Sequence, residues 1–166
     1  GGGRTPSGTI SASVEQWNGT GWTEVNDLNT ARNYFTGVGT VTAALAMGGN
    51  TPGVTGATES YNGTSWTEVN DLNTARLGNP SFGAQAAALT AGGDAPAITA
   101  KTESWNGTSW TEVADLASAR STSGAGGSST AGLIAAGYLA PASPTDLNIS
   151  EEWSVSDYTI KTVTVS

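Results

Sequence analysis

The segment ESYNGTSWTEVNDLNTAR, residues 59–76, decides the fold, because closely similar segments begin at Glu15 and at Glu103. Over its 18 positions, the copy at Glu15 matches at 15 and the copy at Glu103 matches at 14. The copies are spaced by 44 residues, and fixed periods of roughly 20 to 50 residues are typical of solenoids, propellers and other repeat arrays. The sequence therefore predicts tandem units, which lie approximately at residues 1–31, 32–75, 76–119 and 120–166.

Each copy predicts an outer β-hairpin. The alternating segments ATESY (residues 57–61) and SWTEV (residues 65–69) flank Asn62-Gly63, the dipeptide that most favours a two-residue hairpin turn. The following loop, NDLNTAR, contains Asn and Asp, whose side chains can bond to their own backbone.

Two further strands are predicted in each unit. NYFTGVGT (residues 33–40) is an example of the first of these strands, and QAAALTAGG (residues 85–93) is an example of the second. The side chains of the second strand are small and apolar enough for it to be buried on both faces. A glycine pair ends this buried strand where the backbone turns sharply, at Gly48-Gly49 and at Gly92-Gly93.

Four short strands per unit predict an all-β fold, namely a β-propeller with four-stranded blades. About three and a half blades are expected, since the first unit offers only the tail of an inner strand at 1–3 and two outer strands within 13–26. In the last unit, YTIKTVTVS lacks the Trp-Thr-Glu-Val signature, as terminal repeats often do. Residues 1–166 are expected to form one propeller domain or the C-terminal part of one, with an incomplete start and a natural C-terminus.

Composition excludes several classes of function. The net charge is −8, with only six basic residues, which disfavours binding to nucleic acid. Cysteine and histidine are absent, so catalytic triads and metal sites that need thiolate or imidazole are excluded. No run of about 18 apolar residues exists, so no membrane insertion is expected. We predict no enzymatic activity, no cofactor and no metal.

The charged residues of the repeat favour a structural role. Each glutamate is followed by an arginine at the same spacing in every copy, and the expected pairs are Glu15 with Arg32, Glu59 with Arg76, and Glu103 with Arg120. A ring of carboxylates for a cation is the alternative, but repetition in every unit favours ion pairs that tie a strand to the following loop.

The other repeated residues also have two interpretations. The aromatic residues Trp17, Tyr61 and Trp105, with Trp22, Trp66 and Trp110, are predicted to form core between units, the alternative being platforms for sugars. Asp27, Asp71 and Asp115 are predicted to cap turns, the alternative being ligands for Ca²⁺. Asn18, Asn62, Asn106 and Asn148 lie in glycosylation sequons, of which the first three coincide with predicted turns.

Together, the buried strand ending in Gly-Gly, the Glu-x-aromatic strand, the Trp on the next strand and the following Arg resemble the kelch propeller family. The resemblance covers almost the whole chain. It implies that Gly48, Gly49, Gly92 and Gly93 end the second strand of a blade, and that Tyr61, Trp66, Trp105 and Trp110 pack between blades. Two features depart from the family: the period is shorter than the usual repeat of about 50 residues, and Ala136 stands where a glycine is expected.

The repeated segment is also similar to the Thr-, Gly- and Asn-rich kelch-like repeats of virion proteins and tail fibres, particularly in phages of marine bacteria. This resemblance implies a non-enzymatic structural or binding module at the virion surface. The alternative is a secreted or cell-surface bacterial binding protein with kelch-like repeats.

The segments that differ between units are the predicted binding loops, because loops on a rigid scaffold commonly carry recognition. They follow the glycine pairs, and their candidate binding residues are Asn50, Thr51, Asp94, Tyr138 and Asp146. The expected partners are a host-surface glycan or another virion protein, and another copy of the chain is a further candidate.

Overall fold

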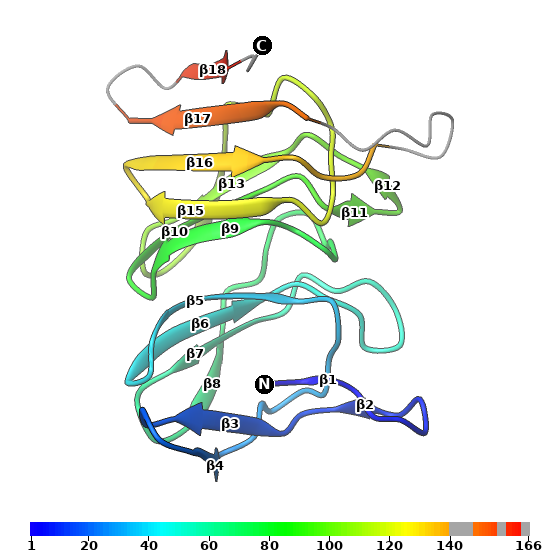
Figure 1. Ribbon diagram of the computed structural model, residues 1–166, viewed down its shortest axis with the longest axis vertical. Coiled ribbons are helices and arrows are strands. Elements are labelled where there is room, and N and C mark those ends of the chain that lie inside the picture. The colour runs from blue at the N-terminus through cyan, green and yellow to red at the C-terminus, as the bar shows by residue number, and fades with distance from the viewer. Residues whose placement is uncertain (140–147, 156–158, 164–166) are drawn as a thin grey trace.

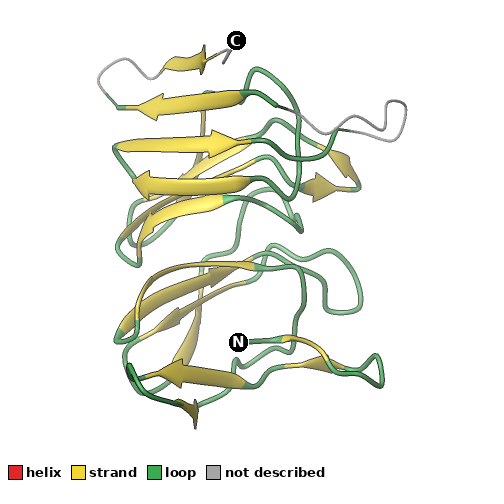
Figure 2. Ribbon diagram, in the orientation of Figure 1, coloured by secondary structure: helices red, strands yellow, loops and turns green. Residues whose placement is uncertain are grey.

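The computed structural model (Figure 1) describes residues 1–139, 148–155 and 159–163. All regular secondary structure in these residues is β-strand, arranged in antiparallel sheets (Figure 2). The prediction of an all-β fold is thereby confirmed. Four sheets, called here the first to the fourth sheet, follow one another along the chain and are stacked along the long axis of the molecule.

The sheets are simple meanders in which strands adjacent in sequence pair with each other. The first sheet contains β3 (Val14–Trp17) and β4 (Trp22–Val25). The second contains β5 (Thr36–Thr40), β6 (Ala43–Met47), β7 (Thr58–Tyr61) and β8 (Trp66–Val69). The third contains β9 (Ser81–Ala84), β10 (Ala87–Ala91), β13 (Thr102–Trp105) and β14 (Trp110–Val113). The fourth contains β15 (Gly124–Ser128), β16 (Ala131–Ala135), β17 (Ser150–Ser154) and β18 (Thr159–Val163).

Two short hairpins lie in the loops, and the sequence had not predicted them as strands. They are formed by β1 (Gly3–Arg4) with β2 (Ile10–Ser11), and by β11 (Asp94–Ala95) with β12 (Ala97–Ile98).

The second strands of the second and third sheets, β6 and β10, form the interior, whereas in β16 of the fourth sheet only Ile134 is fully buried. Leu45 and Met47 in β6 and Leu89 in β10 are buried almost completely, as the small apolar pattern predicted. The glycine that follows β6 is required by a close approach of two chain segments. Gly48 has a φ of 70°, and a Cβ at this position would lie 2.5 Å from the carbonyl oxygen of Arg76.

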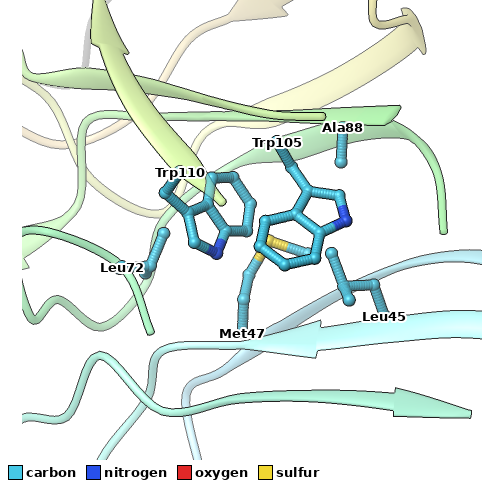
Figure 3. Packing of buried hydrophobic residues seen from close by; sticks show 6 residues of the cluster. All are labelled: Leu45, Met47, Leu72, Ala88, Trp105 and Trp110. Atoms are coloured by element: carbon cyan, nitrogen blue, oxygen red, sulfur yellow. The ribbon is translucent and has the colours of Figure 1, made fainter. Parts of the chain in front are cut away.

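The hydrophobic core lies between consecutive sheets. Figure 3 shows Leu45 and Met47 of the second sheet packed against Trp105 and Trp110 of the third. The same arrangement recurs one sheet later, where Leu89 contributes to a cluster with residues of the fourth sheet. Strands β5, β9 and β15 contact one another in succession, so the first strands of the complete sheets lie side by side.

The outer hairpins differ from the prediction at their turns. Because Tyr61 pairs with Trp66, the connection between them has four residues, and the predicted two-residue turn is wrong. The Asn62 side-chain oxygen accepts hydrogen bonds from Thr64 N and Ser65 N, both at 2.9 Å. The asparagine side chain therefore organises a longer loop than the dipeptide alone would indicate.

Candidate functional site

The repeated glutamates and arginines form buried ion pairs, but not the predicted ones. The Nη2–Oε1 distances are 2.5 Å for Arg32–Glu59, 2.6 Å for Arg76–Glu103 and 2.5 Å for Arg120–Glu151, and the side chains are at most 1% exposed. The predicted pairs Glu15–Arg32, Glu59–Arg76 and Glu103–Arg120 are wrong. Each arginine lies in the connection that enters a sheet, and this connection crosses the third strand of that same sheet, where the next glutamate stands.

Each glutamate also holds the backbone of the incoming connection. The Glu103 carboxylate accepts hydrogen bonds from Asn73 N at 2.7 Å, from Asn73 Nδ2 at 2.9 Å and from Thr74 N at 3.1 Å. Burial lowers the pKa of Arg76, and the neighbouring Glu103 charge opposes this effect. The carboxylate is thus surrounded by N–H donors and a guanidinium, which is the environment of a structural tie.

The aromatic pairs have different surroundings in different sheets. The ring centroids are 5.5 Å apart for Trp17–Trp22 and 5.2 Å apart for Trp105–Trp110. Trp105 and Trp110 are only 3% and 6% exposed, whereas Trp17 and Trp22 are 47% and 66% exposed. Core packing therefore accounts for the pair in the third sheet and not for the pair in the first.

Two of the repeated aspartates, Asp71 and Asp115, bond to backbone. Asp71 Oδ1 accepts a hydrogen bond from Thr58 N at 3.3 Å, and Asp115 Oδ1 accepts one from Thr102 N at 3.2 Å. Within the described residues, no group of three or more His, Cys, Asp or Glu side chains could hold a metal ion. The aspartates thus act as links between the loop and the third strand.

The predicted binding residues that the structure describes lie along one side of the stack (Figure 1). Asn50, Thr51, Asp94 and Tyr138 belong to the segments that follow β6, β10 and β16. These segments lie on the same side of the molecule in Figure 1. Asp146 lies outside the described residues. We call this side of the molecule the loop face.

Backbone pairs fix these loops to the sheets. Asn50 bridges to Asn33, and Tyr138 bridges to Ser121, each next to the arginine connection that enters the same sheet. Asp94 bridges to Leu77 in the same way. The side chains of the loop face are therefore presented from a backbone that the framework holds.

A polar hollow of about 310 Å³ lies where the chain enters β5, β9 and β15, the first strands of the three complete sheets. Its lining includes Thr36, Ser81 and Ser123. Thr36 pairs with Met47, directly before Gly48, and Ser81 pairs with Thr90, two residues before Gly92. The hollow therefore opens beside the loop face.

Comparison of the repeats missed three equivalent residues at this hollow, two of which, Gly78 and Thr122, line it. Tyr34, Gly78 and Thr122 each follow a repeated arginine by two positions, and all have left-handed backbone, with φ of 54°, 60° and 54°. Gly78 N donates to Tyr34 O at 2.8 Å, and Thr122 N donates to Gly78 O at 2.8 Å. Left-handed backbone is costly for Tyr and especially for β-branched Thr. The three residues occupy equivalent positions in the repeat, but because Tyr, Gly and Thr share no backbone preference, the sequence did not indicate a left-handed conformation there.

Two tyrosines near the loop face are open to solvent. Tyr34 is 63% exposed and Tyr138 is 40% exposed. Exposed aromatic rings with polar edges are common contact residues in binding sites. Together with the polar hollow, they make the loop face the candidate functional site.

The part of the chain that the structure describes contains no helix long and apolar enough to cross a membrane. No known protein-family model matches the sequence, and no curated protein has a significantly similar sequence.

Proposed function

We propose that the four sheets are blades of a kelch-like β-propeller and that the protein is a non-enzymatic binding module. The meander order within each sheet, the contacts between successive first strands and the glycine pair after the second strand all support this architecture.

The observation that carries the functional proposal is a division between framework and loop face. The repeated Glu, Arg and Asp residues of the complete sheets are engaged in contacts within the protein. The segments that vary between repeats are presented on the loop face, which has a polar hollow beside it and two exposed tyrosines on or near it. Recognition on a rigid scaffold commonly uses such variable segments.

The proposed ligand is a host-surface glycan, bound through the tyrosine rings and the polar lining, with another virion protein as the alternative partner. The resemblance to repeats of virion and tail-fibre proteins supports a position at the surface of a phage particle. The acidic charge of the chain is compatible with a glycan ligand and unfavourable for nucleic acid.

Binding to an array of bacterial surface glycans tests the proposal. Tyr34→Ala and Tyr138→Ala are expected to lower the affinity for a glycan hit about tenfold or more, as exposed aromatic contact residues do. Val41→Ala is the matched control, because Val41 is exposed in the turn between β5 and β6, at the opposite end of the sheet. Unchanged binding by both tyrosine variants would exclude the loop face as the glycan site.

A further inference from the structure

Among the described residues, the first sheet has only the two outer strands β3 and β4, whereas the other three sheets also have two inner strands. The third strand of each complete sheet is paired on both sides, as β7 is with β6 and β8. Within the described residues, β3 pairs only with β4. Its other edge presents unpaired N–H and C=O groups, and such an edge is a template for a further strand.

Gly1 and Gly2 make contacts equivalent to those of the residues at the end of β6, the second inner strand of the second sheet. Gly2 N donates to Ser13 O at 2.8 Å, and at the equivalent position of the second sheet Gly48 N donates to Ala57 O at 3.0 Å. A Cβ on Gly1 would lie 2.7 Å from Val14 Cγ2, which places Gly1 beside the first residue of β3. Gly1 thus stands where the last residue of β6 stands in the second sheet.

Glu15 is the repeated glutamate that has no arginine. In the described part of the chain it is exposed and forms no ion pair, although Glu59 and Glu103 are buried against theirs. In those two sheets the arginine precedes its glutamate along the chain and lies in the connection that leads into the first strand.

Open space adjoins the free edge of β3. A groove of about 390 Å³ lies between the first and second sheets, and its lining includes Val14, Trp17, Trp22 and Trp66. A second hollow of about 280 Å³ continues from it, beside Gly1 and Leu45. Between the second and third sheets, Trp110, the counterpart of Trp66, is covered by Leu45 and Met47 of β6, the second inner strand of the preceding sheet.

We propose that the first sheet is the docking surface for an arginine-led β-hairpin of this same repeat. The hairpin consists of a connection carrying the arginine followed by two inner strands, as residues 28–47 provide for the second sheet. The proposal rests on the repeated contacts between sheets and is independent of what the loop face binds.

Each part of this occupant has a partner in the first sheet. The arginine pairs with Glu15, and the two N–H groups before it reach the same carboxylate, as Asn29 N and Thr30 N reach Glu59. The second inner strand pairs with the free edge of β3. Its apolar side chains fill the groove, and the leucine at the start of the connection packs on Trp17 and Trp22, as Leu72 packs on the pair of the third sheet.

The test is a chain in which an additional copy of residues 28–47 is joined to Gly2 in place of Gly1. Hydrogen exchange of the β3 amides and oxidative footprinting of Trp17 and Trp22, both resolved by mass spectrometry, report occupation of the surface. We expect β3 to become as protected as β13, and Trp17 and Trp22 to become less reactive than in the original chain.

Two variants isolate the ion pair. Arg32→Met in the grafted copy and Glu15→Gln in the extended chain are each expected to lower the protection of β3, and the double variant is expected to lose little more than either single variant. In the original chain, Glu15→Gln is expected to leave the exchange of β3 unchanged.

Two results would overturn the proposal. One is an extended chain that folds, by circular dichroism, while β3 and both tryptophans remain as accessible as before. The other is protection of Trp17 and Trp22 in the original chain as its concentration rises, together with dimers in ultracentrifugation, because a second copy would then be the occupant. If the extended chain fails to fold, a separate peptide of residues 28–47 added to the original chain provides the same two measurements, and no protection at saturating peptide counts against docking.

Discussion

The first and third sheets carry nearly the same outer hairpin in very different surroundings. Trp105 and Trp110 are buried against the preceding sheet and Glu103 is buried against the connection that enters its own sheet. Their counterparts two periods earlier, Glu15, Trp17 and Trp22, are exposed. The local sequence therefore forms the hairpin, whereas the connection and the sheet that pack against it determine which of its side chains are buried. Arrays of repeats behave in this way because each unit contacts only its neighbours.

The largest difference is expected for the glutamates. Glu103→Gln leaves the buried Arg76 without its counter-charge, and we expect a loss of about 3–5 kcal/mol in the free energy of unfolding. Glu15→Gln is expected to change it by less than about 0.5 kcal/mol, because Glu15 is on the surface. Urea denaturation of both variants measures the difference, and equal losses would contradict the comparison.

A smaller difference is expected for the second tryptophans. Trp110→Ala opens a cavity between the second and third sheets, and we expect a loss of about 3 kcal/mol. Trp22→Ala removes a ring that is mostly in water, with an expected change below about 0.5 kcal/mol. Thermal unfolding of the pair checks this prediction, which fails if Trp22→Ala is as destabilising as Trp110→Ala.

The turns should behave alike in both sheets. Asn18 Oδ1 accepts from Thr20 N at 2.9 Å and Asn106 Oδ1 accepts from Thr108 N at 2.9 Å, so the contact is local and independent of neighbouring sheets. Asn18→Ala and Asn106→Ala are each expected to raise hydrogen exchange at their own turn by a similar factor. The loss should correspond to roughly 1 kcal/mol per turn. A large effect at only one turn would mean that the neighbouring sheet also shapes it.

The smallest effect is expected at the exposed ion pair of the third sheet. Lys101 Nζ lies 2.8 Å from Glu112 Oε2, and the hydrogen bond to Glu112, together with its charge, raises the pKa of Lys101 above its usual 10.5. A raised pKa means that the contribution is fully present below pH 10.5 and is lost as the pH rises through the folded-state value. Lys101→Met should therefore lower the melting temperature slightly at neutral pH, and this difference should vanish at strongly alkaline pH. A difference that persists at high pH would indicate that packing of the lysine chain, not its charge, is responsible.

The sequence predicted the local elements well. The hairpins of β7–β8 and β13–β14, the buried strands β6 and β10, and the sharp turns at Gly48 and Gly92 all follow from alternation, small apolar residues and glycine pairs. These features depend on residues close together in the chain, which a single sequence displays directly.

Contacts between segments were harder to predict. Arg76 has one repeated glutamate before it, Glu59, and another after it, Glu103, and the regular spacing of the repeat alone does not choose between them. The hollow beside Tyr34 and Thr122 was missed because left-handed backbone was adopted by residues that do not favour it. In both cases the deciding interaction lies in three-dimensional packing.

The ion pair described above has a consequence for how such a gene can change. Every full period of the repeat contains one arginine, which pairs with a glutamate later in the chain, and one glutamate, which pairs with an arginine earlier in the chain. Each period therefore carries both partners of this ion pair. A duplication or deletion of one whole period, wherever its boundaries fall, would join an arginine to a glutamate at the correct distance again. Recombination between the nearly identical coding segments could therefore lengthen or shorten the array without designing a new junction, while the loops after the glycine pairs diversify freely.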